Sequence, residues 1–399
     1  MRVPRHTTNA AALAVAAILA GCSEPAGPVD EPIPVAARCD GGVSSFEISV
    51  DREISAVGPS SNELVALDGD LLVVESGANH LSRYSPGRDA LESFVDVGTE
   101  RNPYAAAVDE AAREVWIANY ASHSVTVADA DTGQVLREIE GPGLRNPSAV
   151  ALTEDFAYVG NVHYVGPPEG FGEGSVAVIR RATGAVEAEI ATAFKNPQFL
   201  TVAEIHGEPT LVVSGGGAYQ LGEEVRVISE GGLELFGLGD DPVEPAGEAF
   251  PLGQEDVGTV GAPGRPLVRG ERIYATSGNA PALFVFDLSH RAWEHDAGDP
   301  FWLYEDDGSD LTHSAALADD GLLLVTAFNR DALYVFDVTC MEKLAGPIDL
   351  GRVANMLEGP RGIEFLPGSA DGAHRDAYFL YSIANALGRV RLTPTGESP

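Results

Sequence analysis

Short segments of alternating apolar and polar residues recur along most of the chain. Between Pro103 and Gly141 there are four of them, PYAAAV, EVWIAN, SVTVAD and VLREIEG, separated by polar turns. Alternation over four to six positions between turns rich in Gly, Asn and Asp is typical of half-buried β-strands. The next stretch repeats the same order as PSAVAL, FAYVGN, SVAVIR and VEAEIA. The chain therefore consists of repeated four-stranded units.

Prolines mark the start of most units, and they stand at Pro59, Pro103, Pro147, Pro197, Pro263 and Pro360. The first four are spaced by roughly 45 to 50 residues, and four strands in that length correspond to one blade of a β-propeller. A further unit, which begins at LTHSAAL, has no such proline. The sequence thus predicts seven blades.

The seventh unit lacks one strand, because RGIEFL, DAYFLYS and GRVRL supply only three before the chain ends. The segment SFEISV, residues 45–50, precedes the first unit and is the candidate for the fourth. A strand from the amino-terminal region that completes the last blade closes the ring and removes an exposed sheet edge. We expect an all-β fold, a seven-bladed β-propeller over residues 43–394, followed by a tail at 395–399.

The amino terminus has the pattern of an export signal. Arg2 and Arg5 precede the apolar stretch AAALAVAAILA, which is too short to form a stable membrane span. Residues 1–21 are therefore predicted to be removed. Residues 22–42 contain the polar, proline-rich SEPAGPVDEPIPVAA and predict a flexible tether.

The tetrapeptide Leu19-Ala20-Gly21-Cys22 resembles the lipobox of bacterial lipoproteins. The resemblance implies that Cys22 receives a diacylglycerol and anchors the exported protein to the cell envelope. Ser23 after this cysteine, in place of Asp, implies the outer membrane of a Gram-negative bacterium. The alternative is an ordinary secretory signal with a chance cysteine.

The remaining cysteines, Cys39 and Cys340, are the only possible pair if Cys22 is lipidated. An exported compartment permits a disulfide between them. Two unrelated thiols are the alternative, since the sequence does not give their separation.

Several second strands end in a related tetrapeptide. Residues 116–119 read WIAN and residues 158–161 read YVGN, and their counterparts end at Asn329 and Asn385. These motifs resemble the YVTN-type repeats of bacterial and archaeal surface β-propellers, over about residues 45–394. Blades one, four and five depart from the motif at Glu75, Ser214 and Ser277. The family includes surface-layer, adhesive and binding proteins, and related propellers include enzymes, so the resemblance implies the fold more than an activity.

The charge narrows the choice of partners. The chain has 60 Asp and Glu against 25 Lys and Arg, a formal charge of −35. Such a chain repels nucleic acid phosphates and anionic membrane surfaces. No nucleic acid partner is expected, and membrane association is expected through the lipid anchor only.

One face of a propeller carries both the connections between blades and the turns between second and third strands, around the mouth of the channel. Three of the connections share a basic residue followed by Asn-Pro, beginning at Arg101, Arg145 and Lys195. Together they predict a site for an acidic glycan or small anion. In the alternative, Asn-Pro builds the turn and the cation pairs with neighbouring acids. The longer turns of blades three and four add aromatic residues. The candidate ligand-binding residues on this face are Arg101, Asn119, Arg145, Asn161, His163, Tyr164, Lys195, Tyr219 and Arg361.

No cofactor is expected, although two metal sites are conceivable. Histidines on the same face could bind a transition metal, and these are His80, His123, His163 and His313. The acidic segment at residues 238–260 could bind calcium, but it lacks the DxDxDG spacing. A GxSxG elbow and a phosphate-binding loop are absent from the sequence. Glu364 in an inner strand is the candidate for acid–base chemistry.

These observations predict an exported, lipid-anchored β-propeller that acts as a non-catalytic binding or scaffolding module. Its expected partner is an envelope protein, a glycan or a small anionic ligand. The alternative is a metal-assisted enzyme of the lyase or lactonase type, with its site at the mouth of the central channel.

Overall fold

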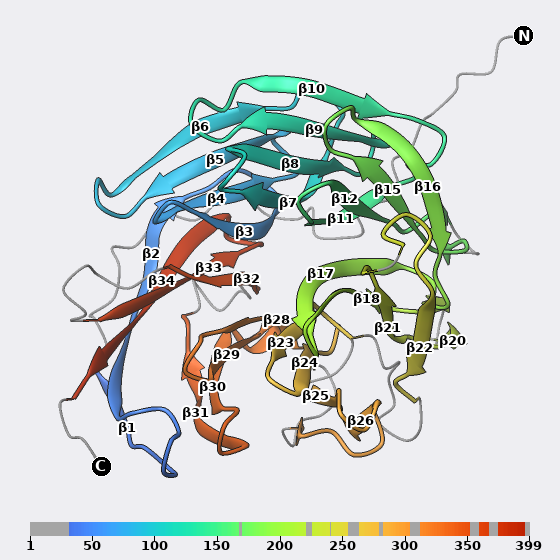
Figure 1. Cartoon of the computed structure of the whole chain (residues 1–399). Coiled ribbons are helices and arrows are strands. Elements are labelled where there is room, and N and C mark those ends of the chain that lie inside the picture. The colour runs from blue at the N-terminus through green and yellow to red at the C-terminus, as the bar shows by residue number, and fades with distance from the viewer. Residues whose placement is uncertain are drawn as a thin grey trace, which may run out of the picture.

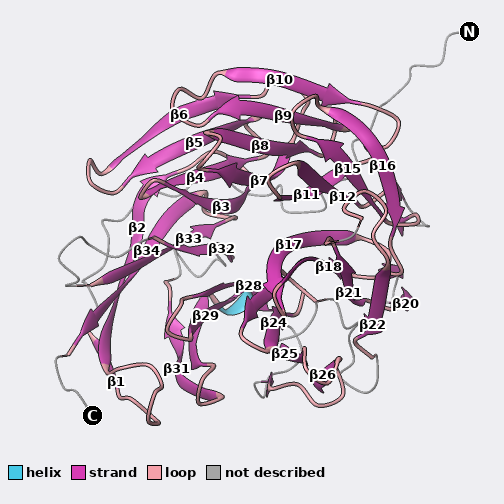
Figure 2. Cartoon of the chain, in the orientation of Figure 1, coloured by secondary structure: helices cyan, strands magenta, loops and turns pink. Residues whose placement is uncertain are grey.

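The computed structural model describes residues 32–166, 170–220, 226–239, 241–253, 263–278, 282–303, 312–351, 359–366 and 374–395. Seven antiparallel sheets surround a central channel, so the predicted seven-bladed β-propeller is confirmed (Figure 1). Figure 2 shows almost no helix in the described chain, and η1 (Phe328–Arg330) is a single short 3₁₀ turn. No described helix has the length and apolar character needed to cross a membrane.

The first four blades follow the chain order from the innermost strand outward. Blade one contains β3 (Ser61–Leu67), β4 (Asp70–Glu75), β5 (His80–Ser85) and β6 (Ala90–Asp96). Blade two contains β7 (Pro103–Asp109), β8 (Glu114–Asn119), β9 (Ser124–Asp129) and β10 (Val135–Glu140). Blade three contains β11 (Pro147–Leu152), β12 (Phe156–Asn161), β15 (Ser175–Arg180) and β16 (Ala185–Ala191). Blade four contains β17 (Pro197–Ile205), β18 (Glu208–Gly215), β21 (Gly232–Gly237) and β22 (Gly247–Pro251).

The last three blades complete the ring. Blade five contains β23 (Leu267–Arg269), β24 (Arg272–Thr276), β25 (Ala282–Asp287) and β26 (Ala292–His295), and β27 (Trp302–Leu303) also pairs with β25. Blade six contains β28 (Thr312–Leu317), β29 (Leu322–Ala327), β30 (Ala332–Asp337) and β31 (Glu342–Asp349). Blade seven contains β32 (Pro360–Phe365), β33 (Arg375–Tyr381), β34 (Ala386–Pro394), β2 (Phe46–Ala56) and β1 (Ile33–Val35).

Two short hairpins are inserted between second and third strands. Blade three carries β13 (Tyr164–Gly166) and β14 (Gly170–Phe171), and blade four carries β19 (Ala218–Gln220) and β20 (Arg226–Ser229). Residues of β14 contact residues of β19, so the two hairpins lie beside each other. They extend the same face of the ring, next to the connections between blades.

The core consists of layers between neighbouring blades, and β8 shows why its sequence is apolar at consecutive positions. Val115 and Ile117 pack against side chains of blade one, whereas Trp116 and Ala118 pack against blade three. Successive residues of a strand point to opposite faces, so a strand between two blades is buried on both. All four side chains are fully buried.

The amino-terminal region closes the ring, as the sequence predicts. Strand β2 pairs antiparallel with β34, from Phe46 opposite Pro394 to Ala56 opposite Ala386. The strand extends beyond the predicted residues 45–50. Its pairing with β34 is interrupted by a register shift between Asp51 and Ser55 and then continues to Ala56. It joins the two ends of the described chain in one sheet.

A fifth strand lies in the segment that the sequence analysis assigns to a tether. Strand β1 pairs with β2, with Ile33 opposite Ile48 and Val35 opposite Phe46. Val35 is buried in the layer between blades six and seven. Proline is tolerated on an edge strand, where its missing N–H costs no ladder hydrogen bond, so the proline-rich composition conceals this strand.

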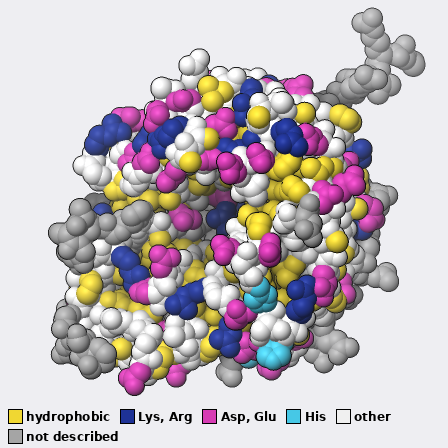
Figure 3. All heavy atoms as spheres, viewed as in Figure 1, with side chains coloured by type: hydrophobic (Ala, Val, Ile, Leu, Met, Phe, Trp, Pro, Cys, Tyr) yellow, Lys and Arg dark blue, Asp and Glu magenta, His cyan; other side chains and the backbone are white. Residues whose placement is uncertain are grey.

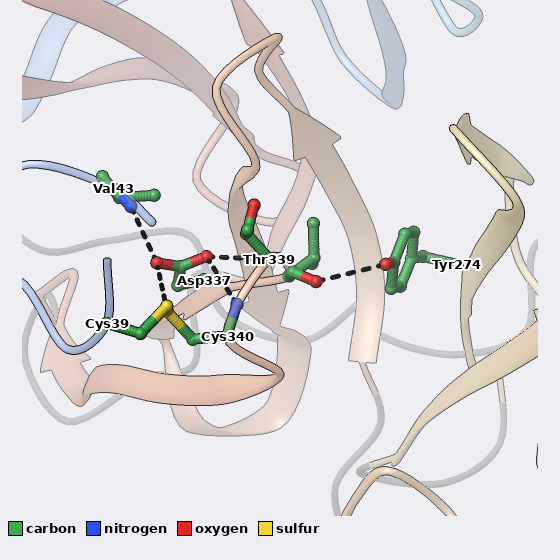
Figure 4. The surroundings of a disulfide bond; sticks show 7 residues. Cys39, Val43, Tyr274, Asp337, Thr339 and Cys340 are labelled. Carbon is green, nitrogen blue, oxygen red and sulfur yellow. Dashed lines mark hydrogen bonds between the residues drawn. A yellow bond between two sulfur atoms is a disulfide. The ribbon is translucent and has the colours of Figure 1, made fainter. Parts of the chain in front are cut away.

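A disulfide fastens the loop after β1 to blade six. Cys39 and Cys340 are bonded, with their Cα atoms 6.0 Å apart. Beside them the fully buried carboxylate of Asp337 accepts hydrogen bonds from the backbone N–H groups of Val43 at 2.8 Å and Cys340 at 3.1 Å (Figure 4). A Cβ at Gly42 would lie 2.4 Å from Asp337 Oδ2, so this close approach requires glycine. We call this group of four residues, Cys39, Cys340, Asp337 and Gly42, the clasp.

Replacement of Cys39 by Ser is expected to lower the melting temperature of the oxidised protein. The bond joins residues separated by 301 positions. A cross-link over such a span restrains the unfolded chain and stabilises the fold by about 2 to 5 kcal/mol. Circular dichroism melts with and without reductant measure the effect. Cys340→Ser should behave alike, and the wild type should match both variants once reduced. An equal melting temperature for oxidised wild type and variants would contradict the role of the clasp.

Candidate functional site

The inner strands of the blades enclose a narrow central cavity of about 60 Å³. Figure 3 shows a hollow near the centre of the ring, with basic and acidic side chains inside it. Residues at or just before the start of the inner strands line this cavity, and they include Asn62, Glu63, Tyr104, Ser148, Gln198, Arg265, Ser314 and Arg361. The inner strands start at the face that carries the connections between blades, so this cavity opens beside the predicted site.

A charged group crosses the channel. Arg265, which precedes β23 of blade five, forms a salt bridge with Glu63 of blade one, and its Nη1 lies 3.9 Å from Glu364 Oε2 of blade seven. The other oxygen of Glu63 accepts the N–H of Ala106 at 2.9 Å. One guanidinium therefore connects three blades that are far apart along the chain.

Burial in the channel shifts the titration of this charged group. Desolvation raises the pKa of Glu364 to about 7, and the nearby Arg265 opposes the rise. Desolvation likewise lowers the pKa of Arg265, with Glu364 acting in the opposite direction. The sequence pointed to Glu364 but not to Arg265. Superposition of the repeats would have placed Arg265 in the channel. It stands two residues after the blade proline, as does Phe199 of blade four, which also lines the cavity.

The basic-Asn-Pro connections serve mainly to build turns, as in the alternative interpretation. Their asparagines, Asn102, Asn146 and Asn196, have φ angles of 53°, 52° and 57°, a left-handed conformation that asparagine tolerates well. Arg101 forms a salt bridge with Glu138, and Lys195 Nζ lies 3.3 Å from Glu173 Oε1.

The two other candidate cations, Arg145 and Arg361, contact oxygen atoms of uncharged groups. Arg145 is exposed, and its Nε donates to the carbonyl of Pro142 at 3.3 Å. Arg361 lines the channel, and its Nη2 donates to Tyr104 Oη at 3.4 Å. Among the described residues, no carboxylate lies within salt-bridge distance of Arg361.

The candidate asparagines are part of the scaffold. Asn161 is fully buried, and its Oδ1 accepts the N–H of Arg145 at 3.0 Å while its Nδ2 donates to the carbonyl of Gly143 at 2.8 Å. Asn119 is also fully buried and donates to Thr126 Oγ1 at 2.8 Å. Both side chains are thus enclosed by the scaffold.

The turn histidines lie on the predicted face but do not converge. His80 contacts the buried Glu75, and His123 Nδ1 accepts the N–H of Asn146 at 2.8 Å. His163 Nε2 lies 3.8 Å from Glu189 Oε1, and burial lowers its pKa. Among the described residues, the only three His, Cys, Asp or Glu donors within 4.8 Å of one another belong to the clasp, at Cys39, Asp337 and Cys340. Both sulfur atoms are bonded to each other in the disulfide, so the clasp is a structural group rather than a metal site.

Several candidates lie partly outside the described residues. His313 belongs to β28 and Tyr219 to β19, but their side chains fall outside the description. The predicted calcium segment is described only in part. There Asp241 Oδ1 accepts the N–H groups of Val243 and Glu244, and Glu248 forms a salt bridge with Arg291.

A row of aromatic side chains leads away from the channel mouth, and we call it the aromatic row. Tyr104 of β7 and Tyr120 in the turn after β8 have ring centroids 5.5 Å apart. Tyr164 and Phe171, on the inserted hairpin of blade three, are also 5.5 Å apart. Asn146 links the two pairs, because its Nδ2 donates to the carbonyl of Tyr120 at 3.2 Å and its Oδ1 accepts the N–H of Tyr164 at 3.1 Å.

The rim motifs hold the aromatic row in place. Asn146 Oδ1 accepts the N–H of Tyr164 at 3.1 Å, and Lys195 Nζ donates to the carbonyl of Phe171 at 3.4 Å. Both ends of the inserted hairpin are thus tied to connections between blades. The longer turn of blade three that the sequence analysis points to contains Tyr164 and Phe171. Tyr104 and Tyr120 were missed, because they stand in blade two, outside the longer turns.

The free energy of unfolding of the wild type is expected to fall as the pH rises, and replacement of Glu364 by Gln is expected to remove this fall. Because the pKa rises from its usual 4.5 to about 7, the folded carboxyl retains a proton that the unfolded one has released in this window. Stability therefore falls as pH increases from 4.5 to 7, by on the order of 2 kcal/mol. Urea unfolding of wild type and variant at both pH values measures the difference. A difference that does not change with pH would contradict the raised pKa of Glu364.

Comparison with known proteins supports the fold alone. No protein-family model and no curated protein matches the chain. Among solved structures, a streptogramin B lyase superposes with a TM-score of 0.62 at 10% identity, covering 87% of this chain and 98% of that one. A hydrazine synthase of Kuenenia stuttgartiensis superposes with a TM-score of 0.59 at 13% identity, covering 86% and 97%. These structures share the propeller architecture with the present chain.

Proposed function

We propose that this protein is an exported, lipid-anchored β-propeller that binds a ligand at the mouth of its channel as a non-catalytic recognition module. The observation that carries the proposal is the aromatic row, which extends from the channel to the inserted hairpin of blade three. Export and lipidation at Cys22 rest on the sequence of residues 1–22, and the resemblance to YVTN-type surface propellers supports a place at the cell envelope.

The aromatic row has the character of a recognition surface. All four rings are partly exposed. Aromatic side chains provide a large, rigid contact area, and tyrosine adds a hydroxyl that can hydrogen-bond at its edge. Val165, in β13 of the same hairpin, is 62% exposed. An apolar side chain in that position gains from a partner that covers it.

Comparison of blades two and three supports a role for the inserted hairpin. Both have the same four-stranded scaffold, but the turn after β8 spans four residues, 120–123, whereas the connection after β12 carries an additional hairpin. The scaffold does not need these residues, because blade two forms without them. Loops that extend from a rigid scaffold are where binding residues concentrate.

The other polar groups of this face favour binding over catalysis. The three described turn histidines and the cations Arg101 and Lys195 contact neighbouring groups of the chain itself. These contacts stabilise the turns and engage the polar groups within the protein itself. The asparagines of the connections act in the same way, since they fix the positions of the rings.

A second candidate is acid–base catalysis in the channel. Its support is Glu364, whose pKa of about 7 suits proton transfer near neutral pH. A solved structure with the same architecture is a streptogramin B lyase, so the fold is compatible with an enzyme. Arg265 lies beside Glu364 and connects it to Glu63, which favours a structural role for this carboxyl.

Binding by the aromatic row is tested on a glycan array with the purified protein. Wild type is expected to bind, and Tyr120→Ala and Tyr164→Ala are each expected to weaken binding at least fivefold, equivalent to about 1 kcal/mol. Leu136→Ala is the matched control, because Leu136 is 50% exposed on the outer strand β10. Thermal melts verify that each variant is folded. Equal binding by wild type and both tyrosine variants, or no glycan bound at all, would refute the proposed site.

A further inference from the structure

Arg361 occupies an unusual place for a cation in this chain. It belongs to β32 of blade seven, yet its guanidinium reaches Tyr104 Oη of blade two, with blade one between them. It therefore extends over the mouth of the channel. Arg101 and Arg265 form salt bridges with carboxylates, whereas no carboxylate of a described residue pairs with Arg361.

The surroundings of Arg361 make it suitable for binding an anionic ligand. The chain has 60 acidic residues against 25 basic ones, so most arginines have an acid within reach. Two acidic residues of the channel, Glu63 and Glu364, lie beside Arg265 and do not pair with Arg361. A guanidinium offers a planar fork of donors that matches a carboxylate, and partial burial strengthens that pairing.

The aromatic row gives the shape of the rest of the ligand. It begins at Tyr104, which contacts Arg361 and packs beside Tyr120. Asn146 bonds the backbones of Tyr120 and Tyr164, and Tyr164 packs beside Phe171. An extended ligand is needed to contact all four rings. Sugar rings suit such a surface, because their C–H faces pack on aromatic rings and their hydroxyls reach the tyrosine edges.

We propose that the ligand is an acidic oligosaccharide, with its sugar rings on the aromatic row and a terminal uronate carboxylate on Arg361. This inference rests on the proposed function and adds the chemical class of the ligand. Arg361 provides the charge selectivity, and the rings provide most of the contact area. Tyr104 positions the guanidinium through the hydrogen bond at 3.4 Å.

Calorimetric titration with trigalacturonic acid and with its methyl ester tests the inference. The ester keeps the sugar chain and removes the charge. Wild type should bind the acid at least tenfold more tightly than the ester, and increasing salt should reduce that preference. Arg361→Gln should abolish the preference while binding of the ester persists, and Arg361→Lys should retain part of it. Arg88→Gln is the control, since Arg88 is exposed in the turn between β5 and β6 and pairs with Glu92.

The outcomes separate this inference from the proposed function. If the protein binds neutral glycans on the array but binds acid and ester equally, or binds neither, the acidic ligand is wrong and the recognition site stands. An unchanged preference for the acid in Arg361→Gln would also overturn the assignment. Tighter binding of hexaglutamate than of trigalacturonate would identify an acidic peptide and overturn the saccharide. Loss of all glycan binding on the array would instead contradict the proposed function.

Discussion

Closure of the ring is the constraint on which the rest of the structure depends. Each blade buries both faces of its strands against its neighbours, so an open ring would expose two apolar faces. The pairing of β2 with β34 prevents this by joining residues 46–56 to residues 386–394. The clasp adds a covalent bond from the loop after β1 to blade six. Closure holds the inner strands at fixed positions, and the channel groups then meet across the ring.

The closed scaffold explains how a site arises from repeated sequence. Every blade contributes the same two kinds of connection to one face, and small changes in these connections distinguish one blade from the next. The basic-Asn-Pro connections have left-handed asparagines, and two of them hold the inserted hairpin through Asn146 and Lys195. The aromatic row is therefore supported by backbone that the fold has already ordered, which would reduce the entropy lost when the proposed ligand binds.

Much of the fold could be predicted from the sequence, because it depends on local alternation and on its repetition. The strands, the seven blades and the closing strand follow from patterns within short windows. Strand β1 did not, since its three residues pair only with β2 and their composition resembles a linker. Contacts across the ring, such as Arg265 with Glu63, depend on which blades face each other and leave no local signal.

The candidate site was harder to predict, because residue type alone gave the wrong grouping. His80 and His123 appeared equivalent, yet the structural counterpart of His123 is Asn79. Both precede a third strand, both have positive φ, and both accept an N–H from the next connection. Alignment by turn position would have separated the histidines. The lipid anchor and the relation to YVTN-type propellers stay predictions from the sequence.

The central claim is that the aromatic row and Arg361 form one binding site on one face of the ring. Hydrogen–deuterium exchange with and without trigalacturonic acid tests it most directly, because it locates the ligand without any substitution. Protection is expected in residues 102–123 and 161–174 and around Arg361. Protection confined to the opposite face, for example in the turn between β30 and β31 beside the clasp, would contradict the account.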